Sequence, residues 1–357
     1  SALASGILLY GCSLIYGFTG STNFEIISNN LDESNMGGVF GIVFILVGLA
    51  FKISAVPFHM WTPDVFEGSP TSVTSFFALI PKIAALCVFI RFMYVPFINV
   101  VDQWQIIIIF LAIASMFLGA IAAINQTNIK RLLAYSSIGH VGYILIALSS
   151  GSLEGFHASV IYIVTYMLMS VGIWSVTSCL EREHPTKRTR TLTDLAMISK
   201  SNPVLAFSTS ILLFSMAGVP PLAGFYAKFC VFLASINASM YVCSIIIILA
   251  SVVSTYYYIR LIKTVYFEKV TNKVFYMTIN INSDVDHATS EADKFLNQYY
   301  GMNIWGDRWG PYGTTEHIVE RIRQYQSSGA ETVVIRFAAF DQERQMELFI
   351  NEILTEF

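Results

Sequence analysis

A series of long apolar segments fills the first three quarters of this chain and constrains its fold more than any other feature. A helix that crosses the hydrocarbon core of a bilayer needs about 20 mostly apolar residues. Because backbone polar groups find no water in that core, spanning segments are helices or closed barrels. We predict eight helical spans, at residues 1–18, 36–58, 72–95, 105–124, 133–150, 157–180, 203–237 and 240–264.

The charge distribution divides the chain into two parts. Of the 357 residues, 55% are hydrophobic and 13% are charged, against about 25% charged in a typical soluble domain. Residues 1–270 contain 14 Lys and Arg and 11 Asp and Glu, whereas residues 271–357 contain 7 and 13. We therefore expect a membrane domain at 1–269 and a soluble domain at 270–357. The five cysteines show no metal-binding spacing, and neither a metal nor a nucleic-acid partner is expected.

A pair of prolines interrupts the seventh apolar segment. The sequence "MAGVPPLAGFYAKFCVF", residues 216–232, contains Pro220 and Pro221. Proline removes a backbone donor and clashes with the preceding turn of a helix. Since 203–237 is also too long for one straight span, two half-helices joined by irregular backbone are predicted.

Basic residues in the connecting segments indicate the orientation. Lys and Arg are enriched in cytoplasmic loops, and three basic groups fall on the same side of the predicted membrane. The even-numbered span ends and the soluble tail are therefore expected in the cytoplasm. Because the chain opens at Ser1 in apparent mid-helix, further sequence upstream is expected. The basic groups are Lys130 and Arg131; Arg182, Lys187, Arg188 and Arg190; and Arg260, Lys263 and Lys269.

Three lysines, Lys52, Lys82 and Lys228, lie inside apolar segments close to prolines. A charge at the centre of a spanning helix costs about 2.5–3.5 kcal/mol on insertion scales. One interpretation is assembly, with each lysine held by a neighbouring carboxylate. The other is an ion pathway, because broken helices expose polar backbone within a bilayer. Three such lysines, each near a broken or kinked helix, favour the pathway.

Lysine suits proton transfer because its charge can change. Burial lowers the pKa of a lysine in general and a nearby carboxylate raises it, whereas arginine stays charged. His59 and His140 are candidates to link the lysines, since histidine titrates near neutral pH. For His140, a structural polar contact is an equal alternative. Asp64 and Glu67 are expected to anchor their loop rather than to join the relay.

Three motifs resemble a known family. The sequences "FKISAVPFHMWTPDVFEGSPTSVTSFFALIPKIAAL", "INQTNIKRLLAYSSIGHVGYILIALSSG" and "MAGVPPLAGFYAKF" are similar to the antiporter-like subunit N family of the proton-pumping NADH:quinone oxidoreductase, respiratory complex I. The resemblance covers residues 1 to about 269. It implies an all-α polytopic membrane bundle with two broken helices in a bacterial-type inner membrane. It also implies a proton path through Lys52, Lys82 and Lys228 with His59 and His140 near it, the other membrane subunits of complex I as partners, and no redox cofactor on this chain.

The chain departs from that family in one respect that matters for the path. The family has fourteen spans, and this chain matches the sixth to the thirteenth. The missing spans carry the glutamate that partners the lysine matching Lys52, and no acidic residue inside an apolar segment of 1–270 replaces it. The resemblance therefore implies that this chain alone does not pump protons.

The tail has the pattern of a small α/β unit. Thr314 or Thr315 is the expected N-cap of its second helix and Gly329 the expected stop, and 331–340 is expected to be a buried strand. In order, the expected elements are a strand at 273–281, helices at 290–301 and 313–330, a strand at 331–340 and a helix at 341–357.

The tail resembles the C-terminal end of luciferase-like flavin- or deazaflavin-dependent oxidoreductases, which are (β/α)8 barrels. The matching residues are "FLNQYYG" and "GTTEHIVERIRQYQSSGAETVVIRFAAFDQERQMELF". The resemblance implies a barrel fragment in which Gly313, Thr314 and Arg336 would contribute to a flavin or deazaflavin phosphate site only if the barrel were complete. Two strands cannot close a barrel, so an inactive fragment is expected, joined to the membrane domain as a chimera rather than as a true gene fusion.

Three functions follow from these features. The first is a proton-translocating membrane subunit of respiratory NADH:quinone oxidoreductase. The second is a subunit of a multi-subunit Na⁺/H⁺ antiporter, which the lysines and broken helices fit equally well. The third is a flavin-dependent monooxygenase-like fragment tethered to a membrane, which stoichiometric flavin absorbance would reveal.

Overall fold

The computed structural model describes most of the chain as two compact units, Ser1–Lys269 and Val270–Phe357. The described residues are 2–31, 36–183, 191–196, 198–267, 274–301, 310–327, 330 and 332–357. Several residues named above lie outside them, namely Lys187, Arg188, Arg190, Lys269 and Gly329.

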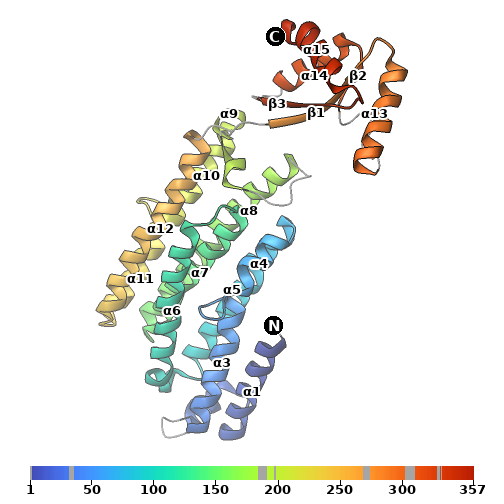
Figure 1. The fold of residues 1–357 in the computed structure, drawn as a ribbon. Coiled ribbons are helices and arrows are strands. Elements are labelled where there is room, and N and C mark those ends of the chain that lie inside the picture. Colours follow the sequence, from blue (N-terminus) through green and yellow to red (C-terminus); the bar gives the residue numbers. More distant parts are fainter. Residues whose placement is uncertain are drawn as a thin grey trace. The chain divides into compact units, whose positions relative to one another are not determined.

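The first unit consists of helices that run alongside one another (Figure 1). Among the described residues of this unit, seven helices are long and apolar enough to cross a membrane, and each coincides with a predicted span. The helices are α1 (Ala2–Thr19), α2 (Phe24–Asn30), α3 (Met36–Ile53), α4 (Trp61–Gly68), α5 (Thr71–Tyr94), α6 (Val101–Ile124), α7 (Ile129–Ser149), α8 (Leu153–Glu183), α9 (Ile198–Ser201), α10 (Pro203–Ala217), α11 (Ala223–Asn237) and α12 (Tyr241–Phe267), with 3₁₀ turns at Ile98–Val100 and Leu192–Leu195.

The seventh predicted span is broken at the two prolines, as the sequence predicts. It forms the half-helices α10 and α11, which are joined by residues 218–222. Gly218 ends α10 in the left-handed conformation, with φ of +89°, which glycine adopts without steric cost. At Gly224 the two half-helices approach closely, because a Cβ there would lie 1.8 Å from the carbonyl oxygen of Ser215.

A second interruption lies between α3 and α4, where the chain turns through residues 54–60. The helix is not broken near Lys82, because α5 continues from Thr71 to Tyr94 through Pro81. Pro81 leaves the carbonyl of residue 77 without its helical donor, yet the flanking turns stay helical. Lys82 is therefore held by an uninterrupted helix.

Helix α7 lies at the centre of the first unit. In its most apolar stretch of 18 residues, 89% of the residues are buried, a larger share than in any other described span. It packs tightly against α6 through small residues, since a Cβ at Gly119 would lie 2.6 Å from the backbone nitrogen of Gly139 and one at Gly142 would lie 2.8 Å from the oxygen of Ala112. Small residues allow helix backbones to approach closely inside membranes. Several polar side chains of α7, among them Ser136, Ser137 and His140, are consequently buried.

The second unit is a three-stranded parallel sheet with helices on both faces. Its strand order is β2-β1-β3, so that β1 is central. Val274–Ile279 of β1 pair with Thr332–Phe337 of β3, and Asn280 and Ile281 pair with β2. The elements are β1 (Val274–Ile281), α13 (Val285–Tyr300), β2 (Tyr312–Gly313), α14 (Thr315–Ser327), β3 (Thr332–Phe337) and α15 (Gln342–Leu348), followed by a π turn at Phe349–Ile353 and a 3₁₀ turn at Leu354–Glu356.

Two expectations for this unit need correction. Strand β3 is not buried, because its residues alternate between exposed and half-buried and it lies at an edge of the sheet. The two-residue strand β2 was not predicted, because so short a segment carries no periodic signal. In a (β/α)8 barrel, consecutive strands are neighbours, whereas here β3 lies beside β1 rather than β2. The unit is thus a small open sheet, and its origin in a barrel stays a prediction.

Candidate functional site

Of the three lysines predicted to lie on a proton path, two are buried in the first unit, and each contacts a hydroxyl group. Lys82 of α5 is 1% exposed, and its Nζ donates a hydrogen bond of 2.8 Å to Oγ of Ser137 on α7. The same Nζ lies 5.2 Å from the centre of the Phe66 ring, a favourable position for a cation. No carboxylate of the described residues forms an ion pair with Lys82.

Lys228 of α11 is held by the end of the other half-helix. Its Nζ donates to the carbonyl oxygen of Ala217 at 2.8 Å and to Oγ of Ser251 at 3.0 Å. Ala217 is the last residue of α10, so its carbonyl has no donor within the helix. The C-terminal end of a helix also carries a partial negative charge that favours a cation. The break in the seventh span therefore supplies an acceptor for Lys228 within the bundle.

His140 connects three helices through two tyrosines. Its Nδ1 lies 2.9 Å from the hydroxyl of Tyr162 on α8, and its Nε2 lies 3.0 Å from the hydroxyl of Tyr258 on α12. The Tyr258 hydroxyl lies in turn 2.5 Å from Oγ of Ser136. Each of these groups can both give and take a proton. Together they form a continuous chain of exchangeable protons from α8 through α7 to α12.

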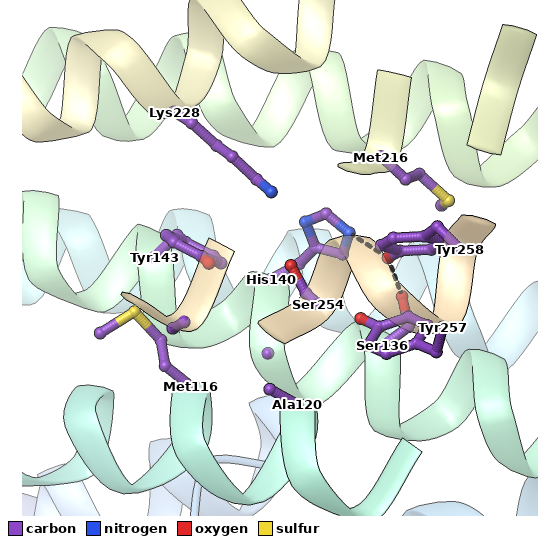
Figure 2. A pocket seen from close by; sticks show the side chains of 12 residues that line it. Met116, Ala120, Ser136, His140, Tyr143, Met216, Lys228, Ser254, Tyr257 and Tyr258 are labelled. Carbon is purple, nitrogen blue, oxygen red and sulfur yellow. Dashed lines mark hydrogen bonds between the residues drawn. The ribbon is translucent and has the colours of Figure 1, made fainter. Parts of the chain in front are cut away.

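A small cavity brings Lys228 and His140 together. Figure 2 shows the amine of Lys228 pointing toward the imidazole of His140, with Tyr143 below the amine and Tyr258 beyond the ring. All four residues line the cavity, whose volume of about 10 Å³ is close to the smallest that holds one water molecule. The hydroxyl of Tyr143 has no hydrogen-bond partner among the described residues. The site thus has room for one small polar bridge beside Lys228.

Lys52 does not join this buried cluster. Its side chain is exposed near the end of α3. Within the described part of the chain it makes no hydrogen bond or ion pair. Lys52 therefore does not share the buried surroundings of Lys82 and Lys228, and a proton path through the three lysines stays a prediction. An apolar sequence around a lysine shows that the residue lies in a span, but not which face of the helix other helices cover.

His59 lies in the turn between α3 and α4 and is 8% exposed. Its Nδ1 has no hydrogen-bond partner among the described residues. The nearby backbone is fixed by other groups, because Val56 N donates to Oγ of Ser115 at 2.9 Å and Thr62 donates to Oγ of Ser54 at 2.6 Å. His59 is thus enclosed beside the second interrupted segment, and its proposed role as a proton relay stays a prediction.

Asp64 and Glu67 act as anchors, as expected, but they belong to helix α4 rather than to a loop. Arg131 of α7 forms ion pairs of 2.8 Å with both carboxylates of α4, and Asn128 donates to Glu67 at 3.0 Å. Lys130, expected in a loop, is instead 2% exposed and donates to the carbonyl oxygen of Ser69 at 2.8 Å. These contacts fix the start of α7 against α4, and they place Ser136, Ser137 and His140 at successive depths along α7.

Sequence reasoning did not identify Tyr162, Tyr258, Ser136 or Ser137 as site residues. Serine and tyrosine are common in apolar helices, where their hydroxyls usually bond the preceding turn, so they do not mark a site by themselves. The spacing of Ser136, Ser137 and His140 in "YSSIGHVGY" was the available signal. It places hydroxyls one helical turn from the histidine.

In the second unit, one of the three weak cofactor candidates lines a cavity. Thr314 is part of the wall of a cavity of about 570 Å³ beyond the carboxyl ends of the strands. Gly313 precedes it at the end of β2, with φ of +127°. Arg336 lies on the edge strand β3, with its guanidinium 5.1 Å from the centre of the Tyr299 ring. The structure therefore does not gather the three candidates around one cavity.

The first unit matches a family model described as NADH:quinone oxidoreductase/Mrp antiporter, TM, over residues 1–254. Among curated relatives, NADH-quinone oxidoreductase subunit N of Pelagibacter ubique is 58% identical over 269 residues, which are 75% of this chain and 57% of that protein. The subunit N of Paramagnetospirillum magneticum is 52% identical over 275 residues, which are 75% and 56%. The chain thus spans little more than half the length of these relatives.

Chains of solved respiratory and Mrp complexes are also similar to the first unit. A chain of respiratory complex I from Thermus thermophilus with bound aureothin has a TM-score of 0.65 at 33% identity, covering 75% of this chain and 57% of that one. A chain of the membrane-bound sulfane sulfur reductase, an archaeal respiratory membrane complex, has a TM-score of 0.69 at 28% identity, covering 76% and 57%. A chain of the Mrp complex from a Dietzia species has a TM-score of 0.69 at 24% identity, covering 76% and 50%, and shows the shared fold.

Proposed function

The chain belongs to the NADH:quinone oxidoreductase/Mrp antiporter transmembrane family, and we propose that it acts as a proton-translocating membrane subunit of respiratory NADH:quinone oxidoreductase. The relatives that are 58% and 52% identical over 75% of this chain are named subunit N of that enzyme. The other membrane subunits of the complex are its proposed partners. The proposal places the redox chemistry on other chains, with no redox cofactor on this one.

The observation that carries the proposal is the polar chain inside the apolar bundle. Lys228, His140 and Tyr258 lie around one cavity, and Tyr258 and Ser136 continue the chain along α7. Ser137, the next residue of α7, accepts the hydrogen bond of Lys82. Buried ionisable groups in spanning helices are costly. No hydrogen bond joins Ser136 to Ser137 or Lys228 to His140 among the described residues, but the gathering of these groups along α7 and around one cavity, with an amine at each end, favours transport over a purely structural role.

The chemistry assigns a separate part to each group. Lysine carries a proton on its amine and can release it, whereas the hydroxyls and the imidazole accept a proton at one atom and release one at another. The flexible side chain of Lys228 allows its amine to reach two different sets of polar groups. One is the end of α10 with Ser251, and the other is the cavity beside His140. We propose that movement of the amine between them passes a proton to or from the histidine.

The test of this role compares substitutions of two lysines on neighbouring helices. Lys228→Met removes the buried amine, whereas Lys263→Met removes an exposed amine near the end of α12. In vesicles that contain the assembled complex with this chain, NADH-driven acidification should be lost in Lys228→Met and retained in Lys263→Met. Equal acidification by the two variants would contradict the role proposed for Lys228.

A second candidate is a subunit of a multi-subunit Na⁺/H⁺ antiporter, since the family model includes the Mrp antiporters. This candidate predicts that the chain co-purifies with Na⁺/H⁺ exchange rather than with quinone reduction. The identity to subunit N, 58% in one relative, favours the oxidoreductase. Exchange activity of the purified assembly in the absence of NADH and quinone would favour the antiporter instead.

For the second unit we propose no catalytic part in this function. The likeness to luciferase-like oxidoreductases remains a prediction from the sequence, as do a cytoplasmic position of this unit and its origin as a chimera. A flavin or deazaflavin bound at one per chain would show as visible absorbance of the purified protein. Its detection would support the tethered-enzyme alternative.

A further inference from the structure

The outer faces of α5 and α8 enclose a groove that the proposed function does not use. The groove has a volume of about 430 Å³, and its walls are almost entirely apolar. Cys87 and Ile90 of α5 form one wall, and Val160, Ile163 and Val164 of α8 form the other. Val160 and Val164 are 40% and 48% exposed. The groove is therefore open to whatever surrounds these two helices.

One cation lies at the end of this apolar groove. Arg91 belongs to the last turn of α5, its side chain is exposed, and it is part of the groove lining. Its guanidinium lies 5.7 Å from the centre of the Phe24 ring, and it forms no ion pair with the described residues. The neighbouring Tyr94 donates its hydroxyl to the oxygens of Leu148 and Ser152 at 3.3 and 3.1 Å. Within the described part of the chain, Arg91 therefore has no acidic counter-charge.

The length of the groove fits one leaflet of a bilayer. Its lining on α5 and the residue after it extends from Ile83 to Val95, which is about 18 Å at 1.5 Å per helical residue. One leaflet of the hydrocarbon core is about 15 Å thick. Arg91 and Tyr94 lie at the end that reaches the interface, where arginine and tyrosine meet lipid headgroups. The apolar part then runs toward the middle of the bilayer.

The same two helices provide an internal comparison. Toward their other ends, α5 and α8 enclose a second groove of about 310 Å³ with Ser75, Leu79 and Cys179 in its lining. Among the residues whose side chains the structure describes, no charged residue lines this second groove. A surface that merely receives any acyl chain would not distinguish the two grooves, whereas a site that binds a phosphate headgroup requires the cation.

We propose that the groove lined by Arg91 binds an anionic phospholipid of the leaflet at the C-terminal end of α5. Arg91 binds the phosphate of the headgroup through its forked N–H donors. One acyl chain lies between α5 and α8 against Cys87, Val160 and Val164. The site would secure a lipid at a fixed position against the two helices that flank the buried polar chain.

The first test measures binding of phosphatidylglycerol to the full chain in detergent by native mass spectrometry. Arg91→Gln should weaken binding about fivefold, the effect of one basic residue near an anionic membrane surface. Lys263→Gln, which removes an exposed cation of α12 away from the groove, should leave it unchanged. Val164→Trp fills the groove at a side chain that is already 48% exposed, so it should abolish this binding without disturbing the fold. Retention of wild-type affinity by both Arg91→Gln and Val164→Trp would overturn the proposal.

The second test uses two exposed thiols of the chain. Cys87 lines the groove with the cation and Cys179 lines the groove without it. Phosphatidylglycerol should slow alkylation of Cys87 by an apolar maleimide and leave Cys179 unaffected, and inorganic phosphate alone should protect neither. Equal protection of both thiols by phosphatidylcholine would show a general lipid coat and would contradict the proposal. Protection of Cys87 that persists in the delipidated complex would show that another subunit covers the groove, which also contradicts it.

Discussion

The amine of Lys228 donates a hydrogen bond of 2.8 Å to the carbonyl oxygen of Ala217, the residue at which α10 ends. The interruption of the seventh span and the cation beside it therefore depend on each other. The break frees a carbonyl, and the lysine of the next half-helix binds it. A continuous helix would offer no such acceptor at this depth, because its carbonyls are bonded within the helix.

Lys228→Arg should separate charge from proton exchange. Arginine satisfies the end of α10 but stays protonated, so we expect assembly and thermal stability near those of the wild type. Proton translocation should fall about a hundredfold, the scale of a lost proton-transfer group. The measurement is NADH-driven acidification of vesicles alongside the yield of assembled complex. Normal translocation with arginine would show that Lys228 acts only as a fixed charge.

Ser137→Ala should expose the dependence of Lys82 on one hydroxyl. The variant removes the acceptor that lies 2.8 Å from the fully enclosed amine. An unmatched buried polar group costs about 1–3 kcal/mol, so the midpoint of thermal unfolding in detergent should fall. Ser175→Ala is the matched control, since its hydroxyl is exposed and bonds only its own helix at Val171. Equal midpoints for both variants would argue against a supporting role for Ser137.

Tyr258→Phe should interrupt the chain of exchangeable protons while keeping the ring. The hydroxyl contacts both His140 and Ser136, so its loss removes the bridge between them. We expect slower proton translocation with NADH oxidation less tightly coupled to it. Tyr256→Phe, on the same helix but 59% exposed, should behave as the wild type. An unaffected pump in Tyr258→Phe would exclude this hydroxyl from the path.

Glu67→Ala should destabilise the first unit more than Asp64→Ala. Glu67 accepts hydrogen bonds from both Arg131 and Asn128 and its side chain is 32% exposed, whereas that of Asp64 is 73% exposed. Exposed ion pairs contribute at most about 1 kcal/mol. We expect a loss of about 1–2 kcal/mol for Glu67→Ala, by analogy with other hydrogen bonds to charged groups, and almost none for Asp64→Ala. Chemical unfolding of the detergent-purified chain distinguishes them, and the reverse order would contradict the assigned anchoring.

Gly224→Ala should push the two half-helices apart. A Cβ at Gly224 would lie 1.8 Å from the oxygen of Ser215, and this backbone atom cannot move without shifting α10. Overpacking of this kind costs about 1–3 kcal/mol. Gly6→Ala in α1 is the control, because a Cβ there meets no atom within 4 Å. A stable Gly224→Ala variant with unchanged transport would show that the junction tolerates more space than the structure indicates.

The spans were predictable from the sequence because length and hydropathy fix them before packing does. The Pro220–Pro221 break followed from covalent chemistry alone. Pro81 did not end its helix, which continues to Tyr94, since spanning helices tolerate a proline. In the tail, β3 resembled a buried strand by composition, whereas its edge position depends on which strands pair with it.

The site was predictable only in part, for a related reason. Lys82, Lys228 and His140 stood out because ionisable side chains are rare in apolar segments. Lys52 has the same sequence context and yet is exposed, since the sequence around a residue does not show which helices cover it. Tyr162 and Tyr258 became visible only once α8 and α12 were placed against α7. Contacts between residues 22 and 118 positions apart leave no local pattern in the sequence.

The carbonyl that holds Lys228 belongs to the main chain, and this has a genetic consequence. A substitution at position 217 changes only the side chain, so it leaves that acceptor in place unless the backbone itself moves. Random mutagenesis should therefore rarely recover loss-of-function alleles there. Alleles should accumulate instead at Lys228 itself and at residues such as Gly224 and Ser215 that set the spacing of the two half-helices. Second-site revertants of a spacing defect should map to the facing half-helix.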